Sequence, residues 1–265
     1  MTASYEPFIR DVLLLRDRVP SFDEYPFNIP GIHGLTTLPL HPKVTYFIGE
    51  NGTGKSTLLE AIAVVEGLNA EGGSRNFSFA TRPSHSNLCE CLRINRGNRR
   101  RGQMDAFFLR AESFYNVATE VDRVGDPRVL MKHYGGRSLH EQSHGEAFLS
   151  LVTGRFRGDG LYLLDEPEAA LSPTRQMSML TAIHYLIREG SQFIIATHSP
   201  IVMAYPEATI YEFSSAGIQP INYLDTEHYK VTRLFLDRRE QMLRELLAET
   251  DDPDVPASEG ARPHL

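Results

Sequence analysis

The chain has 265 residues, of which 41% are hydrophobic and 23% charged, so it can bury a core of ordinary size. Its formal net charge of −7 excludes a general polyanion-binding surface, so nucleic acid would need a local patch. Apolar runs are short, and we expect no membrane insertion. The two cysteines, Cys89 and Cys91, are too close in sequence for an ordinary disulfide, which favours a reducing, cytoplasmic compartment.

The first predicted strand covers residues 12–19. Residues 22–39 are punctuated by Pro and Gly and predict a connection to the next strand. Two aromatic residues of this connection, Tyr25 and Phe27, could stack on a nucleotide base or simply pack in the core. The sequence leaves these alternatives open.

Residues 49–57, Gly-Glu-Asn-Gly-Thr-Gly-Lys-Ser-Thr, match the phosphate-binding pattern G-x-x-x-x-G-K-[ST]. A predicted strand at 44–48 precedes them and a predicted helix at 55–66 follows, which is the context that cradles phosphate. The lysine is placed to reach the β- and γ-phosphates and the serine to ligate Mg²⁺. The residues expected to hold the nucleotide are Gly49, Asn51, Gly52, Thr53, Gly54, Lys55, Ser56 and Thr57.

Residues 69–105 are rich in Gly, Ser, Asn and Arg, and we expect an inserted lid or arm with one strand near 88–94. This insertion could carry an anion or nucleic-acid patch, or it could end in a solvated hairpin tip. The absence of interleaved aromatic residues favours the solvated tip. The arginines concerned are Arg93, Arg96, Arg99, Arg100 and Arg101.

A predicted strand at 106–110 leads to Glu112, at a position where ATPases with a phosphate loop carry a side chain that senses metal and water. The next residue, Ser113, suits the N-cap of a helix.

Residues 143–146, Ser-His-Gly-Glu, precede an apolar helix. Ser143 and Glu146 form a capping-box pattern, which needs no ligand. The same hydroxyl, the amide of Gly145 and the helix N-terminus could instead bind a γ-phosphate. Ser143, Gly145 and Glu146 are therefore further candidates for nucleotide binding.

Residues 160–166, Gly-Leu-Tyr-Leu-Leu-Asp-Glu, predict a buried strand with two carboxylates at its carboxyl end, where ligands collect in α/β sheets. Asp165 is predicted to hold the Mg²⁺ shell through water. Glu166 is predicted to orient or deprotonate the attacking water.

A predicted helix then starts at the N-cap Ser172 and stops at Gly190. Its inward residues are expected to be Met177, Leu180, Ile183 and Ile187.

Another buried strand, predicted at 193–197, ends in His198. This histidine would point at the γ-phosphate, where it can hydrogen-bond phosphate or the catalytic carboxylate. A strand at 209–213, a closing helix at 226–247 and a disordered tail at 250–265 complete the predictions.

In this order, the motifs resemble the ATP-binding-cassette (ABC-type) P-loop ATPases. The Walker A loop is at 49–56, the Walker B strand at 161–165 and the D-loop near 170–172, and His198 is the switch. Ser-His-Gly-Glu replaces the usual signature Ser-Gly-Gly-Gln, and Glu112 stands where transporters have Gln. The chain looks like the soluble bacterial predicted AAA/ABC-like ATPases, which are related to SMC-like and OLD-like ATPases, and unlike transporter subunits.

The resemblance implies an α/β P-loop NTPase fold with a mostly parallel sheet, flanking helices, an antiparallel β part and the inserted arm, in one domain over residues 1–249. It implies catalytic roles for Lys55, Glu166 and His198, and a magnesium site at Ser56, Asp165 and Glu112. It also implies a head-to-tail homodimer around two ATP that serves an unidentified protein partner as motor or switch. A transporter energy subunit and a slow ATP-dependent module acting with DNA or a nuclease remain alternatives.

Overall fold

The computed structural model describes residues 5–74, 86–98, 105–111 and 143–248. The predictions for Glu112 and Ser113, for the arginines at 99–101 and for the tail at 250–265 lie outside these residues. Within the described ranges, no helix has both the length and the apolarity needed to cross a bilayer.

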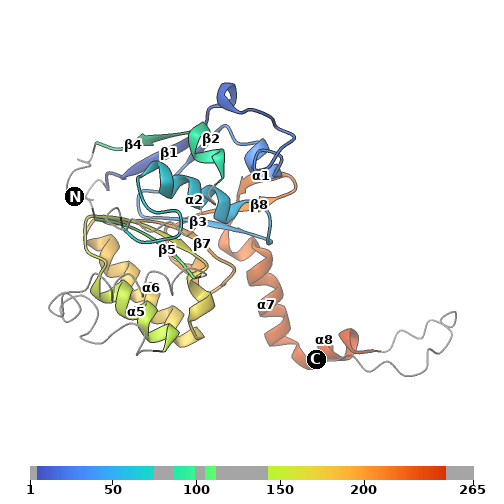
Figure 1. Cartoon of the computed structure of the whole chain (residues 1–265). Coiled ribbons are helices and arrows are strands. Elements are labelled where there is room, and N and C mark those ends of the chain that lie inside the picture. Colours follow the sequence, from blue (N-terminus) through green and yellow to red (C-terminus); the bar gives the residue numbers. More distant parts are fainter. Residues whose placement is uncertain (1–4, 75–85, 99–104, 112–142, 249–265) are drawn as a thin grey trace.

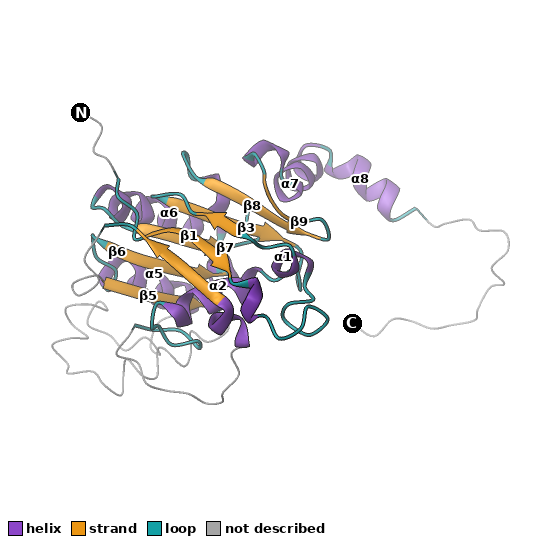
Figure 2. Ribbon diagram, turned by 90° about the horizontal axis from the view of Figure 1, so that it is seen from above, coloured by secondary structure: helices purple, strands orange, loops and turns teal. Residues whose placement is uncertain are grey.

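The described strands form two sheets (Figures 1 and 2). The larger has the order β5-β6-β7-β3-β8-β9, and all its neighbours are parallel except β8 and β9. The smaller is antiparallel, with the order β2-β1-β4. This arrangement confirms the predicted fold class. The strands are β1 (Ile9–Leu14), β2 (Thr37–Pro39), β3 (Val44–Gly49), β4 (Leu92–Arg96), β5 (Asp105–Arg110), β6 (Gly160–Asp165), β7 (Gln192–Ala196), β8 (Thr209–Ser214) and β9 (Gly217–Pro220).

Helices cover both faces of the large sheet, and the small sheet lies beyond one of these layers (Figure 1). Helix α2 packs between the two sheets, whereas α5 and α6 cover the opposite face. The helices are α1 (Pro30–His33), α2 (Lys55–Val65), α5 (His144–Gly154), α6 (Pro173–Arg188), α7 (Glu227–Asp237) and α8 (Arg239–Leu246). Short 3₁₀ helices are η1 (Arg16–Arg18), η2 (Asn87–Cys91), η5 (Pro167–Ala170), η6 (Val202–Ala204) and η7 (Tyr223–Asp225).

The apolar run in β6 explains how this strand is held. Side chains alternate across a sheet, so Leu161 and Leu163 join the core around α2, whereas Tyr162 and Leu164 join the core around α5 and α6. All four are fully buried. The strand therefore ends at a fixed position and presents Asp165 there.

Residues 86–98, within the range predicted as an insertion, form η2 and β4, and β4 pairs with β1 in the small sheet. The strand starts at Leu92, later than predicted. Leu88 and Cys91 are both buried three residues apart, which suits a 3₁₀ turn, and the alternation of a strand begins only after them. The first strand also differs: β1 ends at Leu14, because the exposed, charged residues 16–18 turn as η1.

The predicted C-terminal helix is two helices, separated at Arg238, whose φ of −130° is not helical. Neither α7 nor α8 buries a residue fully, and both project from the body of the molecule (Figure 1). They do not close the core as predicted.

A buried glutamine joins the two sheets. Gln192, at the start of β7, is 1% exposed. Its Oε1 accepts from the backbone N–H groups of Phe8 and Ile9, both at 2.9 Å, and its Nε2 donates to the carbonyls of Ile9 (2.8 Å) and His41 (3.0 Å). One side chain thus satisfies backbone groups of Phe8, Ile9 and His41, those of Phe8 and Ile9 in buried hydrogen bonds, and it sets where β1 begins.

Replacing Gln192 by Leu is expected to lower the free energy of unfolding by about 3 kcal/mol, because the backbone groups it serves would stay buried without partners. Urea unfolding followed by circular dichroism measures the change. The matched control is Gln219→Leu on exposed β9, which should shift stability by less than about 0.5 kcal/mol. Equal effects of the two changes would show that Gln192 does not join the sheets.

Candidate functional site

The loop after β3 has the backbone that an anion-binding loop requires. Gly49, Gly52 and Gly54 have positive φ angles of 129°, 79° and 99°. A Cβ on Gly49 would lie 2.1 Å from the carbonyl oxygen of Phe213 in β8, so only glycine fits there. The loop ends at Gly54, the N-cap of α2, and the amides of the first turn of α2 therefore point into it.

Lys55 lies at the centre of this loop with 4% of its surface exposed. Its Nζ donates to the carbonyl oxygens of Gly49 (2.7 Å) and Glu50 (2.8 Å). Burial lowers the pKa of Lys55, and the negative charges of Glu166, Asp165, Glu168 and Glu50 oppose that change. The lysine is therefore the cation of an acid-rich site.

The Walker A serine and the Walker B aspartate are in contact. Ser56 Oγ donates to Asp165 Oδ1 at 2.8 Å, and the aspartate is 5% exposed. A hydroxyl and a carboxylate oxygen side by side suit Mg²⁺, which takes few protein ligands and completes its shell with water and phosphate. Groups of three or more His, Cys, Asp or Glu residues that could hold a metal do not occur in the described part of the chain. The donor set therefore fits Mg²⁺ delivered with a nucleotide better than a resident metal.

Sequence reasoning missed a cation beside Asp165. Arg110 ends β5, and its Nε lies 3.3 Å from Asp165 Oδ2, while its Nη1 donates to Glu60 Oε2 of α2 at 2.7 Å. The signal lies in the strand pairing, because the parallel register of β5 and β6 places Arg110 opposite Asp165. Arg110 balances part of the negative charge of this carboxylate.

Glu166 and His198 lie at the ends of neighbouring strands. Glu166 has φ 50° and ψ 49°, a left-handed conformation that costs a non-glycine residue roughly 1–2 kcal/mol, and its N–H donates to the carbonyl of Ala196 at 2.9 Å. His198 Nε2 lies 3.6 Å from Glu166 Oε1. Burial and the charge of Lys55 lower the pKa of His198, and Glu166 opposes this. The structure thus brings the predicted water-activating and switch residues together.

Glu168 is a second carboxylate that the sequence did not single out. Its Oε1 accepts from the backbone N–H of His198 at 2.6 Å, which fixes the switch segment to the turn after β6. Burial raises the pKa of Glu168, and the hydrogen bond from His198 opposes this.

The switch segment is also tied to α6. Ser199 Oγ donates to Gln176 Oε1 at 2.6 Å, and Gln176 Nε2 donates to the carbonyl of Leu171 at 3.0 Å. This buried glutamine corrects the predicted inner face of α6: Met177 is 54% exposed, and Met179 and Leu186 are buried instead. A satisfied polar residue occupies the face that hydrophobicity alone assigned to Met177.

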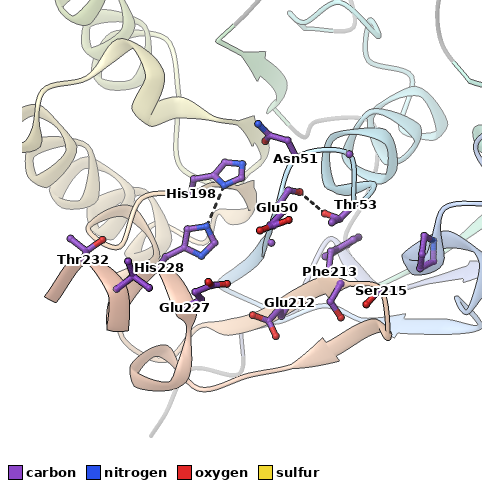
Figure 3. A pocket seen from close by; sticks show the side chains of 15 residues that line it. Glu50, Asn51, Thr53, His198, Glu212, Phe213, Ser215, Glu227, His228 and Thr232 are labelled. Atoms are coloured by element: carbon purple, nitrogen blue, oxygen red, sulfur yellow. Dashed lines mark hydrogen bonds between the residues drawn. The ribbon is translucent and has the colours of Figure 1, made fainter. Parts of the chain in front are cut away.

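A pocket of about 1040 Å³ opens beside the phosphate loop. Figure 3 shows that it lies between this loop, the end of β8 and the first turns of α7. His198 and His228 face each other across its wall, with Nδ1 of the first 3.2 Å from Nε2 of the second. His228 is another residue that sequence reasoning missed, because nothing in the sequence places α7 next to the switch.

The remaining predicted nucleotide ligands form a separate group at the start of α5. Ser143 is the N-cap, and Glu146 Oε2 accepts from its N–H (3.1 Å) and from its Oγ (2.8 Å). Arg175 of α6 donates to Ser143 Oγ (3.3 Å) and to Glu146 Oε1 (3.2 Å). A Cβ on Gly145 would lie 2.7 Å from the carbonyl of Ala170, so α5 packs tightly on η5. Ser143 and Glu146 are exposed.

Two family models match the chain. One, described as "AAA domain, putative AbiEii toxin, Type IV TA system", matches residues 92–204, and the other, described as "AAA domain", matches residues 28–127. Together they span the phosphate loop, the signature helix, the Walker B strand and the switch, which the structure arranges as described above. Both models describe AAA domains, so the chain resembles AAA-type ATPase domains over residues 28–204.

The chain also resembles individual proteins, at 16–26% sequence identity. A 187-residue stretch is 26% identical to ABC transporter G family member STR2 of Medicago truncatula, and covers 64% of this chain but only 25% of that relative. The SMC head domain from Thermotoga maritima is 16% identical, with a TM-score of 0.46 over 81% of this chain and 99% of that one. The cbiO1 protein of Clostridium perfringens, part of the ABC transporter complex cbiONQ, is 17% identical, with a TM-score of 0.47 over 91% and 100%.

The structure separates the two aromatic candidates for base stacking. Phe27 is fully buried in the core around α2. Tyr25 is 65% exposed, and its hydroxyl lies 3.4 Å from Thr57 Oγ1 in the first turn of α2. Tyr25 alone of the two has a face that a base can reach.

The structure describes two of the five clustered arginines. Arg96 forms an ion pair with buried Glu66 at 2.6 Å, whereas Arg93 is exposed. An arginine held by a buried carboxylate is poorly placed to bind phosphate, so the described part of the cluster forms no polyanion patch. The other three arginines lie outside the described residues.

The pKa of Glu168 leads to a prediction about stability and pH. The folded state binds this proton more readily than the unfolded chain, in which the pKa is near 4.5, so the charged carboxylate costs stability above the folded pKa. Glu168→Gln removes the charge and keeps the acceptor for His198, so its stability relative to wild type should rise as the pH increases above 4.5, and level off above the raised pKa of Glu168. Glu168→Ala removes the acceptor too and should cost about 1–3 kcal/mol. Thermal melts across this range measure both; a Gln variant that loses stability as the pH rises would contradict the assignment.

Proposed function

We propose that the chain hydrolyses ATP with Mg²⁺, that two copies close head to tail around two ATP, and that this cycle serves a protein partner as motor or switch. The observation that carries the proposal is the contact between Ser56 and Asp165 at 2.8 Å, with Lys55, Glu166 and His198 around it. Residues from three segments far apart in sequence, 55–56, 165–166 and 198, thus meet at the phosphate loop.

The phosphate loop would bind the triphosphate through amides and one lysine. Two N–H groups of Lys55 donate to loop carbonyls, and its third can reach a β- or γ-phosphate oxygen. The carbonyl contacts fix the ammonium in place before the nucleotide enters, so little side-chain entropy remains to be lost on binding. Tyr25 is placed to stack on the base, beyond Thr57.

Ser56 and Asp165 would hold Mg²⁺, which, when bound, screens the charge of the triphosphate from the carboxylates of the site. Arg110, beside Asp165, would keep that side chain oriented. Glu166 is placed to take the proton of the attacking water. His198, neutral because its pKa is lowered, can donate from Nε2 to Glu166 or to the γ-phosphate.

The exposed residues Ser143 and Glu146 at the start of α5 are placed where they could bind the γ-phosphate across a dimer interface. Ser143 hydrogen-bonds Glu146 and Arg175 of its own chain, and it faces solvent. A helix N-terminus stabilises phosphate charge, but the carboxylate of Glu146 would oppose it. Arg175 compensates that carboxylate, so the tip remains suited to the γ-phosphate held by another copy.

Lys55→Ala should weaken binding of ATP by about 2–4 kcal/mol, or roughly 30- to 1,000-fold in Kd, because the buried ammonium is the cation of the site. Equilibrium titration with a fluorescent ATP analogue measures this. The matched control is Lys43→Ala: Lys43 precedes β3 and pairs with Glu207 on the surface, so its loss should leave the Kd within about twofold. Comparable binding by both variants would contradict the site.

Glu166→Gln should bind ATP without hydrolysing it and accumulate as an ATP-bound dimer, because the base is lost and the ligands remain. Light scattering with and without ATP measures the mass, and Lys55→Ala is the control that should stay monomeric. A Glu166→Gln protein that stays monomeric at saturating ATP would count against the dimer.

A mixing experiment tests whether each site is shared. Lys55→Ala and Ser143→Arg should each abolish hydrolysis. In a dimer of either variant, every site lacks a working phosphate loop from one chain or a working start of α5 from the other. Co-expressed chains should recover activity, up to about half of the wild-type rate, since each mixed dimer has one intact site of two. Without sharing, mixed dimers contain no intact site, and the activity would stay at background.

One alternative has an observation in its favour: a transporter energy subunit, which the match to the transporter family member STR2 suggests. Co-purification of the chain with an integral membrane protein would support this alternative, and an isolated ATP-dependent dimer would not.

A further inference from the structure

His228 contacts the switch histidine from a helix that otherwise stands apart from the body. It lies in the first turn of α7, its Nε2 is 3.2 Å from Nδ1 of His198, and the ring centroids are 5.4 Å apart (Figure 3). The side chains of α7 beyond it include exposed Val231 and Leu234. The histidine contact is therefore a specific one, and not part of a packed helix interface.

The start of α7 is fixed next to the switch. Thr226, fully buried, caps the helix: its Oγ1 accepts from the N–H of Tyr229 (3.3 Å) and donates to the carbonyl of Tyr223 (2.8 Å). The hydroxyl of Tyr223 donates to the carbonyl of Pro200 at 2.9 Å, two residues after His198. His228 is thus attached through short connections to the segment that its ring contacts.

The hydrogen-bond partners of His198 and His228 determine which nitrogens of the two rings carry protons. Glu166 and a γ-phosphate offer only acceptors to His198 Nε2, so this nitrogen must carry the proton to interact with either. In a neutral ring Nδ1 is then bare and accepts from His228 Nε2–H. His228 Nδ1 is in turn bare. Both outer nitrogens, His198 Nε2 and His228 Nδ1, are buried without a hydrogen-bond partner among the described residues, but His198 Nε2 has the acceptor Glu166 Oε1 at 3.6 Å, so the proton is better placed there. An unused lone pair on His228 Nδ1 costs less than an unused N–H.

We propose that His228 is a positioning residue for hydrolysis: its Nε2–H holds His198 with the proton on Nε2, aimed at Glu166 and the γ-phosphate. This inference rests on the proposed ATP hydrolysis. It makes the first turn of α7 part of the site, so the orientation of the switch depends on where this helix sits.

The charged groups around the pair give the inference a pH dependence. Lys55, Glu166 and the turn with Glu168 face His198, whereas Glu227, Glu212 and Lys55 act on His228. Burial lowers the pKa of both histidines below 6.5, so both are neutral at neutral pH. Two protonated rings can only donate, so acidification through the lowered pKa values breaks their hydrogen bond. On acidification, the rate of hydrolysis should therefore decrease only at pH values below the usual pKa range of histidine.

The test compares His228→Leu with His228→Gln, whose amide can still donate to His198 Nδ1. The Leu variant should lose on the order of 10-fold in kcat, the loss typical of removing such a supporting partner, with KM for ATP within about twofold. The acid limb of its pH–rate profile should move to higher pH, because His198 without the hydrogen bond from His228 is protonated more easily. The Gln variant should recover most of the rate. His184→Leu, which removes another histidine hydrogen bond, that of Nδ1 with the hydroxyl of Tyr205 at 3.0 Å, is the matched control and should leave kcat and the pH profile unchanged.

Imidazole ¹⁵N NMR of the nucleotide-free wild type gives a readout that needs no hydrolysis. It should show His198 protonated on Nε2 and bare on Nδ1 at neutral pH, and a mixture of tautomers in His228→Leu. The inference is overturned by an unchanged acid limb in the Leu variant, by a folded Gln variant without recovery, or by a neutral wild-type His198 protonated on Nδ1. If wild type and Lys55→Ala hydrolyse ATP equally slowly, the proposed function fails, and the NMR result still decides the hydrogen bond.

Discussion

The order of the strands in the large sheet is the constraint on which the site depends. Strand β7 lies between β6 and β3, so the loop after β3, the switch after β7 and the carboxylates after β6 end along one edge in that sequence. The hydrogen bond from Ser56 to Asp165 spans this arrangement, since it connects the helix after β3 to the strand beyond β7. Parallel strands buried on both faces hold these ends in register. A different strand order would leave the same motifs apart.

The charges within the site are balanced by contacts that differ in kind. Three of the four carboxylates that act on Lys55 lie at the end of β6 or just after it. Of these, Asp165 has Ser56 and Arg110 as partners, and Glu168 accepts from the backbone N–H of His198. Within the described part of the chain, the side chain of Glu166 has the longer contact with His198, at 3.6 Å, and its backbone is strained. Of these three carboxylates, Glu166 has the fewest close partners, so it is the one best placed to act on water.

The sequence predicted those parts of the molecule that local pattern determines. Strands β3, β5, β6 and β7 are continuous apolar runs, and the phosphate loop between β3 and α2 is set by its glycines, so these elements lie close to where they were predicted. The switch and Walker B residues were found because they follow such strands. The fold class followed from the order of these elements.

The residues that were missed or misplaced depend on contacts between distant segments. Arg110 acquires its role from the pairing of β5 with β6, and His228 from the placement of α7 beside β7. Gln176 is buried because Ser199 and Leu171 satisfy it, which displaced Met177 from the predicted inner face of α6. The break between α7 and α8 at Arg238 could not be predicted, because no glycine or proline marks it in the sequence.

The close approach of Gly145 to Ala170 has a consequence for communication between nucleotides. Because no side chain fits between them, the tip of α5 and the turn that starts at Glu166 move as one block within a subunit. In the proposed dimer that block belongs to one site through Glu166 and to the other through Ser143. A shift that accompanies cleavage of one ATP would then be transmitted mechanically to the second site. Hydrolysis at the two sites would therefore be correlated.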